Sequence, residues 1–188
     1  YAIVASVLDN GVQIIDISDP TDIVAKDAKD DGDSGGFTEL ARAASVDTFV
    51  IGSSTYAIVA SGINTGDDGV QIIDISDPAN IVATDAETDG VNGFTELDGP
   101  EDVDAFTCGA KTYAIVAAGS DDGVQLIDLS DPANIVATDA ETDGVNGFDV
   151  LAGVYNVEAF EMNDKLYALV AAFTDDGVQM IEMPCGQS

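Results

Sequence analysis

The sequence predicts an all-β fold, namely a β-propeller of four-stranded antiparallel blades, with about four blades in this chain. Three observations predict it. A strand-like run of one tyrosine and small aliphatic residues occurs four times, Gly-Val-Gln and a second apolar run follow it each time, and no segment has a convincing helical period. Short strands repeated in this way are typical of stacked or radial β arrays, and four-stranded meanders in series form propellers.

Each repeat contains four strand-like segments. In the first, Val and Phe alternate with acids, which gives one apolar face. The second reads Tyr-Ala-Ile-Val-Ala, or Tyr-Ala-Leu-Val-Ala, and is apolar on both faces, as expected of a strand between two sheets. The third is Gly-Val-Gln and the apolar run, and the fourth is a short Ile-Val-Ala run. In this order the segments lie at 46–50, 103–107 and 157–161; 1–5, 56–60, 113–117 and 167–171; 11–18, 69–76, 123–130 and 177–183; and 23–25, 81–84 and 135–138.

The connections carry turn residues. Asp-Asp-Gly at 67–69, 121–123 and 175–177 joins the second and third strands, and Asp-Gly is expected to supply the positive-φ residues of a tight hairpin. Ser-Asp-Pro at 18–20, 76–78 and 130–132 is expected to end the third strand, because proline lacks a backbone donor and forces the preceding residue to be extended.

The repeats divide the chain into units of about 1–44, 45–99, 100–153 and 154–188 within one propeller. The first unit begins at its second strand and the last ends after its third, so the units should hold three, four, four and three strands. Three arrangements fit this count: a closed ring with two incomplete blades, an arc of a larger ring, or one ring completed by two chains. The first residue lies inside a strand pattern, which predicts a mature product or a fragment.

The repeated wording resembles a known family. Tyr-Ala-Ile-Val-Ala followed by Gly-Val-Gln-Ile-Ile-Asp-Ile-Ser-Asp-Pro is similar to the repeats of LVIVD-repeat propellers, and the likeness extends over nearly the whole chain. The resemblance implies a propeller fold and an extracellular or cell-surface setting, and it carries no catalytic residues to transfer. The repeat here is about 54 to 58 residues long, which exceeds the roughly 40 to 45 residues of a compact four-stranded blade.

Composition excludes several functions. The net charge is −31, from 36 acids and 5 bases, so binding to nucleic acid or to an anionic membrane would be repulsive. Such acidity fits divalent-cation binding, life in high salt, or solubility outside the cell. The chain has no histidine, the commonest general base, and its two cysteines cannot complete a zinc site of the usual ligand set. No apolar run is long enough to predict membrane insertion.

One acidic stretch predicts calcium binding. Between 85 and 96, acids stand at the first, third, fifth and twelfth positions and a glycine at the sixth, which resembles an EF-hand loop whose oxygens surround a hard cation. The third copy keeps most of these residues but has Val150 in place of the closing glutamate. The candidate calcium ligands are Asp85, Glu87, Asp89, Asn92, Glu96, Asp139, Glu141, Asp143 and Asn146.

Each acidic motif also has a structural interpretation. In a strand, Asp85, Glu87 and Asp89 would share one face, so an outer blade strand with an acidic solvent face gives the same spacing. Acids inside the third strand could form a carboxylate ring, but a buried acid that accepts backbone N–H bonds from a nearby turn is favoured. These acids are Asp16, Asp74, Asp128 and Glu182.

The two cysteines are predicted to be close. Cys108 falls in the turn between the first and second strands, and Cys185 follows the third strand of the next unit. In antiparallel meanders both places lie at the same end of adjacent blades. A disulfide between them is therefore feasible, above all in a secreted protein, and two unrelated thiols are the alternative.

These features predict a non-enzymatic, extracellular binding or adhesion module, stabilised by calcium in acidic loops. Its partner would be a protein or a glycan at a loop rim, or another copy of itself. One alternative is a structural subunit of a cell-surface layer or fibre. A second is a metal-dependent propeller hydrolase or lyase, which would need carboxylates with open coordination positions in the central channel. The acidity alone is also explained by salt adaptation.

Overall fold

The computed structural model describes residues 1–62, 67–183 and 185, and these residues form fourteen strands in four antiparallel sheets without a helix. The sheets contain three, four, four and three strands, which confirms the predicted fold and strand count. Their strands are β1 (Ala2–Ser6), β2 (Gly11–Asp16) and β3 (Val24–Asp30); β4 (Ala43–Ile51), β5 (Ser54–Ser61), β6 (Gly69–Asp74) and β7 (Val82–Thr88); β8 (Pro100–Cys108), β9 (Lys111–Ala118), β10 (Gly123–Asp128) and β11 (Val136–Thr142); and β12 (Val154–Met162), β13 (Lys165–Ala172) and β14 (Gly177–Met183).

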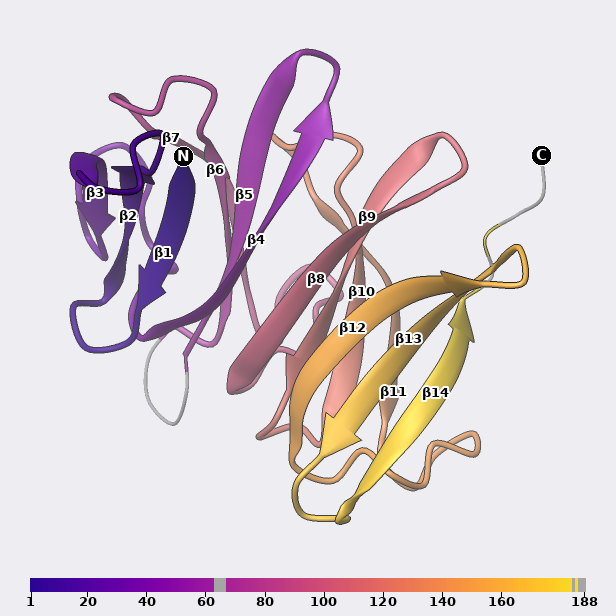
Figure 1. The fold of residues 1–188 in the computed structure, drawn as a ribbon. Coiled ribbons are helices and arrows are strands. Elements are labelled where there is room, and N and C mark those ends of the chain that lie inside the picture. Colours follow the sequence, from indigo (N-terminus) through magenta and orange to yellow (C-terminus); the bar gives the residue numbers. More distant parts are fainter. Residues whose placement is uncertain (63–66, 184, 186–188) are drawn as a thin grey trace.

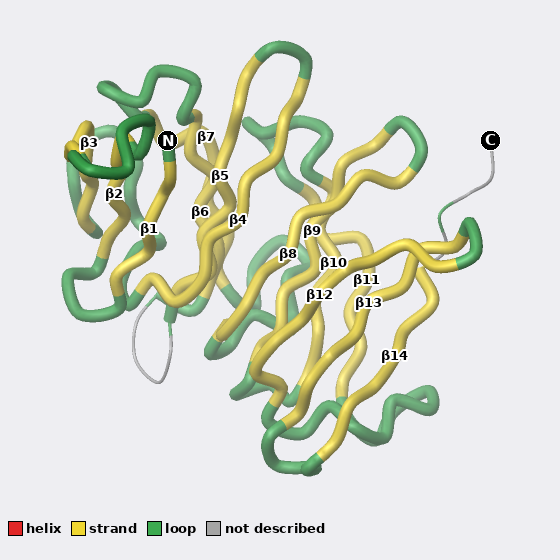
Figure 2. Tube along the Cα trace, in the orientation of Figure 1, coloured by secondary structure: helices red, strands yellow, loops and turns green. Residues whose placement is uncertain are grey.

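The four sheets fan out like the blades of a propeller (Figure 1). The first strands of neighbouring sheets meet on the inner side of the fan, where β4 contacts β8 and β8 contacts β12. The first and last sheets lie at opposite ends of the fan. Within each sheet the strands follow chain order as a meander, so the linkers that carry the chain to the next sheet all lie at one end (Figure 2).

The core consists of aliphatic layers between adjacent sheets. One layer places Ile58 and Val70 of the second sheet in the same fully buried cluster as Val116 and Ile127 of the third. Equivalent layers join the first sheet to the second and the third to the fourth. Because the second and third strands are apolar on both faces, one sheet contributes to two layers at once. Each fully buried Val or Ile contributes about 1.5 to 3 kcal/mol.

A buried glutamine joins each full sheet to the linker before it. The side-chain Oε1 of Gln71 accepts the backbone N–H groups of Thr38 and Glu39 at 3.1 and 3.3 Å, and its Nε2 donates to the carbonyl of Asp85 at 2.6 Å. Gln125 makes the same three bonds in the third sheet, with Thr95, Glu96 and Asp139. The repeated glutamine of Gly-Val-Gln is therefore a connector between blades.

The Asp-Asp-Gly turns work differently from the prediction. The second aspartate, not the glycine, has positive φ, at 47° for Asp68 and 55° for Asp122. The glycine begins the third strand, where a Cβ on Gly69 or Gly123 would collide with the backbone carbonyl of Glu87 or Glu141 on the neighbouring fourth strand. Glycine is thus required for close strand approach, and aspartate tolerates the left-handed conformation because its short side chain bonds locally.

The fourth strands are longer than predicted. They run to Asp30, Thr88 and Thr142, so they include the first part of each acidic stretch that sequence reasoning assigned to a loop. A one-residue bulge near Thr84 and near Thr138 shifts the register with the third strand. The added length explains part of the long repeat.

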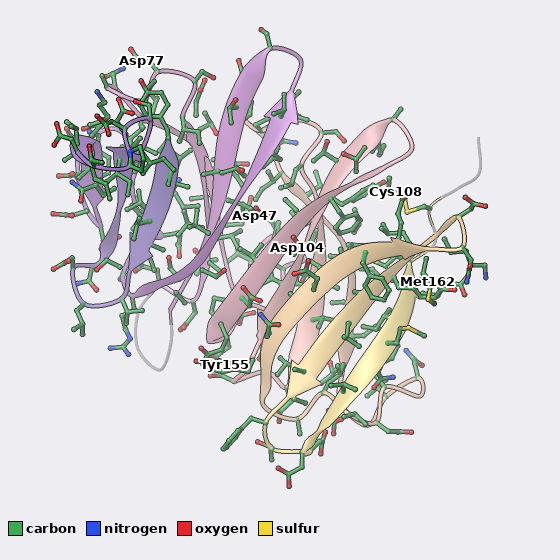
Figure 3. The ribbon with its side chains drawn as sticks, in the orientation of Figure 1. Asp47, Asp77, Asp104, Cys108, Tyr155 and Met162 are labelled. Atoms are coloured by element: carbon green, nitrogen blue, oxygen red, sulfur yellow. A yellow bond between two sulfur atoms is a disulfide. The ribbon has the colours of Figure 1, made fainter. Side chains whose placement is uncertain are left out.

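The predicted disulfide is present. Cys108, the last residue of β8, is bonded to Cys185, which follows β14, with the two Cα atoms 5.3 Å apart. The bond joins the third sheet to the chain segment after the fourth, and Figure 3 shows Cys108 at the end of the third sheet.

Replacing Gln125 by Ala should lower the free energy of unfolding by about 2 to 4 kcal/mol, because two linker N–H groups and the carbonyl of Asp139 lose partly buried hydrogen bonds to the fully buried Gln125 side chain. Urea denaturation followed by circular dichroism measures the change. Gln13 is the matched control, since it occupies the same motif position in the first sheet but is exposed. Gln13→Ala should change stability by less than about 0.5 kcal/mol. Equal losses in the two variants would contradict the connector role.

Candidate acidic sites between the sheets

The predicted calcium ligands of the second repeat have separate hydrogen-bond partners. Asp85 accepts the backbone N–H of Ile135 in the next sheet at 2.7 Å, and Glu87 accepts from the Asn92 amide at 2.9 Å. Asp89 accepts the N–H of Leu97 at 3.1 Å, while Glu96 accepts the Thr142 hydroxyl at 2.5 Å. Asp85 and Glu87 lie in β7, so the stretch is half strand and half loop rather than one continuous calcium loop.

The third copy repeats this arrangement. Asp143 accepts the N–H of Leu151 at 3.0 Å, Glu141 accepts from the Asn146 amide at 3.1 Å, and Asp139 accepts only the N–H of its neighbour Ala140 at 3.0 Å. Across residues 1–62, 67–183 and 185, no three acidic or cysteine side chains are arranged to hold a metal ion.

Asp89, Asp143 and several neighbouring acids bind the backbone of the linkers between sheets. After Gln71 has bound the N–H groups of Thr38 and Glu39, Asp31 accepts the N–H of Leu40 at 3.4 Å and Asp67 accepts that of Ala41 at 3.0 Å. The next linker is bound in the same way by Gln125, Asp89 and Asp121. Four successive linker N–H groups are therefore hydrogen-bonded to side-chain acceptors. They need such acceptors because a linker without secondary structure provides no backbone partners.

Glu39 is the most buried acid at these junctions. It is 7% exposed, its Oε1 accepts the Thr88 hydroxyl at 2.5 Å, and its Oε2 is buried without a partner in the described structure. Burial, together with the negative charges of Asp67, Asp31 and Asp68, raises the pKa of Glu39 to about 7. Glu96 is its counterpart at the next junction, and burial raises its pKa as well. Sequence reasoning included Glu96 among the cation ligands but left Glu39 out, because the first copy has one extra residue before Glu39 and a lysine, Lys29, at a ligand position.

A second set of acids joins the inner strands. Asp47 accepts the N–H of Ala105 at 2.8 Å, and Asp104 accepts that of Ala159 at 2.6 Å, so each inner strand binds the backbone of the next (Figure 3). Burial raises the pKa of Asp104 to about 6, and the charges of Asp47 and Glu158 add to the effect. From the sequence, these acids were predicted only to lie on the strand face opposite the apolar one.

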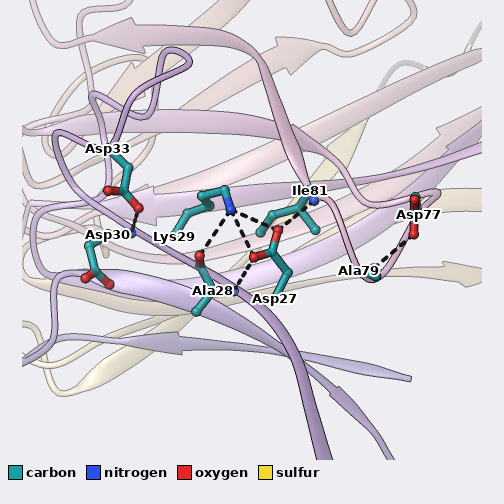
Figure 4. A network of polar contacts seen from close by, with 8 residues as sticks. All are labelled: Asp27, Ala28, Lys29, Asp30, Asp33, Asp77, Ala79 and Ile81. Carbon is teal, nitrogen blue, oxygen red and sulfur yellow. Dashed lines mark hydrogen bonds and ion pairs between the residues drawn. The ribbon is translucent and has the colours of Figure 1, made fainter.

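The outer strands use aspartate in the same way, and the first junction adds a lysine. Asp27 accepts the N–H of Ile81 at 3.0 Å and forms an ion pair with Lys29 at 2.9 Å (Figure 4). Although burial acts to raise the pKa of Asp27, the hydrogen bonds from Lys29 and Ile81 lower it overall. Asp27 and Asp85 therefore connect consecutive outer strands through a single N–H bond each.

The aspartates inside the third strands have the structural role that was favoured. Asp74 accepts the N–H of Ser76 and Asp128 that of Ser130, each at 2.9 Å, so they close the turn after the strand. Three lysines also pair with this position: Lys111 with Asp128 at 2.7 Å, Lys26 with Asp16 at 3.1 Å and Lys165 with Glu182 at 2.6 Å. These contacts account for acids within otherwise apolar runs.

The sequence model of the LVIVD repeat matches residues 1–29 and 53–84. These segments contain the second and third strands of the first two units and the start of the fourth, which are the strands that build the aliphatic layers. The chain thus carries LVIVD repeats in these two segments. The same strand sequences recur in the third and fourth sheets. A search of curated proteins finds no match to the chain.

One solved structure with a TM-score above 0.5 shares the fold of this chain. A protein from Lactobacillus plantarum matches it with a TM-score of 0.56 at 13% identity, over 95% of this chain and 52% of that protein. The chain thus spans about half the length of that structure, and the likeness concerns fold alone. Two further structures match with TM-scores below 0.5 and support no argument. They are a candidate exo-β-1,3-galactanase from Bifidobacterium bifidum s17 (0.47, 15% identity, 82% of this chain and 56% of that one) and a functionally unknown protein from Desulfotomaculum acetoxidans DSM 771 (0.44, 11%, 95% and 64%).

Within the described residues, the search for a long apolar helix that could cross a membrane finds none.

Glu39 predicts a measurable pH dependence of stability. Its pKa in the folded state is about 7, above its ordinary value of 4.5, so between these values the folded state holds more protons and its stability falls as pH rises. Glu39→Gln removes this loss. At a pH of about 8 the variant should be more stable than the parent by about 1 to 2 kcal/mol, a value reduced for solvent screening, and the difference should vanish near pH 4.

Urea denaturation across this pH range measures the difference. Glu161→Gln removes one charge at an exposed position of β12 and controls for the general relief of charge repulsion. A gain as large in Glu161→Gln as in Glu39→Gln would contradict the assignment.

Proposed function

We propose that this chain is a non-enzymatic, extracellular binding module of the adhesion type. The observation that carries the proposal is the use of the repeated polar side chains: Gln71, Asp85, Asp104 and their counterparts bind backbone groups of neighbouring sheets. The repeated polar residues thus stabilise the fold, and we expect a binding partner to contact positions that differ between repeats. The disulfide supports an oxidising compartment, because such bonds persist mainly outside the cytosol.

The favoured recognition surface is the hairpin end of the fan, by which we mean the end that carries the turns between the first and second strands of the sheets. The tips between the first and second strands differ in every sheet: Gly52-Ser53, Gly109-Ala110 and Asn163-Asp164. At the opposite end the same Asp-Asp-Gly turn recurs three times. Exposed apolar residues flank two of the tips, Val50 in β4 and Met162 in β12, and Figure 3 shows Met162 beside its tip. A partner that contacts several tips would read a different sequence at each blade.

The binding module is tested on a panel of purified polysaccharides and cell-surface proteins by surface plasmon resonance. At least one should bind saturably, and the double variant Val50→Ser, Met162→Ser should weaken that binding by about tenfold or more. Leu8→Ser is the control, because Leu8 is also apolar and is even more exposed but lies in a turn at the opposite end. Saturable binding that Leu8→Ser weakens and the double variant leaves unchanged would sink the proposed surface, and turnover of a panel member would sink the non-enzymatic assignment.

We also propose calcium as a stabiliser of the acidic stretch between Asp85 and Glu96. Its support is the ligand spacing, the net charge of −31 and the buried Glu96 Oε2, which has no partner within the described residues. To bind a cation, the carboxylates of Asp85 and Asp89 would have to coordinate it while they keep the backbone N–H groups that they accept, or give up those hydrogen bonds. A bound cation would also relieve repulsion among neighbouring carboxylates.

Millimolar calcium should raise the thermal midpoint by about 5 °C more than sodium chloride of matched ionic strength, since a ligand at about a hundredfold excess over its Kd adds about 2.7 kcal/mol. Glu87→Gln should remove most of this increment, whereas Glu161→Gln, at an exposed site in β12, should keep it. Equal effects of calcium and matched sodium would leave salt adaptation as the explanation of the acidity.

A further inference from the structure

The last sheet has an unpaired outer edge. Its third strand, β14, pairs with β13 only, whereas the third strands of the other sheets, β2, β6 and β10, each pair with a fourth strand as well. Throughout the described part of the chain, nothing pairs with the outer edge of β14. Unpaired edges of this kind are templates for an added strand.

A groove runs along this edge. Two adjoining cavities of about 130 and 220 Å³ share Leu126 and Asp139 of the third sheet and Met183 of β14. Phe106 and Phe148 extend the apolar lining. The groove is therefore largely apolar, with the carboxylates of Asp139, Glu141 and Glu182 at its wall.

The other sheets show what occupies this position. At the first junction Ile81, which immediately precedes β7, is 2% exposed and clusters with Ile14. At the second, Ile135 is 4% exposed and clusters with Ile72. Leu126 is the counterpart of Ile14 and Ile72 in the strand alignment. Whereas those two residues pack against an isoleucine of the next sheet, Leu126 lines the groove.

The polar partner of that isoleucine is also in place. Asp27 Oδ2 accepts the N–H of Ile81, and Asp85 Oδ2 accepts that of Ile135. Asp139, the next in this series, lines the groove, and its Oδ1 accepts the N–H of Ala140. Its Oδ2 accepts no hydrogen bond from the described residues. The groove thus offers an apolar surface for an isoleucine side chain and an acceptor for the isoleucine N–H. These are the two contacts that the fourth strands of the second and third sheets make.

We propose that the outer edge of β14 binds an extended segment of a partner polypeptide with the fourth-strand pattern, an isoleucine followed by small residues. The segment adds antiparallel to β14, its isoleucine fills the groove against Leu126, and the isoleucine N–H donates to Asp139. A basic segment is favoured, because the chain has a net charge of −31 and Asp139, Glu141 and Glu182 line the groove. Of these, Glu182 already forms an ion pair with Lys165 at 2.6 Å, so Asp139 and Glu141 are the acids that attract the segment. In the first sheet Lys26 of the fourth strand pairs with Asp16, the counterpart of Glu182.

This proposal depends on the fold and not on the recognition surface at the hairpin end. The probe is a labelled, capped peptide with the sequence of residues 23–29, Ile-Val-Ala-Lys-Asp-Ala-Lys, which carries the isoleucine and both lysines. Fluorescence anisotropy with the whole chain in about 0.15 M salt measures its affinity. One saturable site is expected, with shifts of the β14 amide resonances on binding.

Asp139→Ala should weaken peptide binding about tenfold, since a charge-assisted hydrogen bond is lost. Asp149→Ala removes the same charge at an exposed position outside the groove lining and should leave the affinity unchanged. A peptide with Asn in place of the isoleucine should bind at least tenfold more weakly.

Absence of saturable binding by the unaltered peptide to the folded chain would overturn the proposal. Equal affinities of the parent and Asp139→Ala would overturn it as well. Light scattering tests whether a second copy occupies the edge instead. A dimer that excess peptide does not dissociate would assign the edge to self-association and overturn the proposal.

Discussion

The structure depends on burial of aliphatic strand faces between neighbouring sheets. Each Tyr-Ala-Ile-Val-Ala strand is apolar on both sides, so one residue set packs forward and the other packs backward. Val59 belongs to the layer with the first sheet, while Ile58 belongs to the layer with the third. A sheet without two neighbours leaves one of these sets exposed, and this is seen at Leu169 and Val178 in the last sheet. The fan is held together by interfaces, not by a single central core, as in other repeat architectures.

The aliphatic layers bring a second requirement, which explains much of the acidity. The linkers between sheets have no ladder of their own, and their N–H groups need acceptors near the buried layers. Aspartate, glutamate and glutamine side chains supply them, as at Asp89, Asp104 and Gln125. The cost is the crowding of carboxylates, and it is greatest where Glu39 is buried next to three aspartates and its pKa rises to about 7. Acceptance of backbone N–H groups thus accounts for many of the acids in these repeats.

Sequence reasoning predicted the features that periodicity and repetition determine: the four sheets, their strand counts, the closing role of Asp74 and Asp128, and the disulfide. It could not predict the partners of the acids, because an EF-hand-like spacing and an outer strand with acceptor side chains read alike at Asp85, Glu87 and Asp89. It also assigned the glycine of Asp-Asp-Gly to a conformational role. Gly69 is required because a Cβ at this position would collide with the neighbouring strand, and this requirement is visible only in the tertiary structure.

The two ends of the fan are not equivalent. At the first sheet the outer strand is present, and the exposed Gln13 stands where its counterparts bind a preceding linker. At the last sheet the inner strand is present, and the groove beside β14 stands where its counterparts bind an outer strand. In the part of the chain that the structure describes, the first sheet therefore lacks a linker for its glutamine, and the last lacks an outer strand of the kind that Ile81 and Ile135 begin in the second and third sheets. Because the two ends differ in chemistry, an amide at one end and an aliphatic groove with carboxylates at the other, a single ligand type cannot satisfy both. Recognition at β14 is thus directional, and it follows from the repeat itself rather than from any added motif.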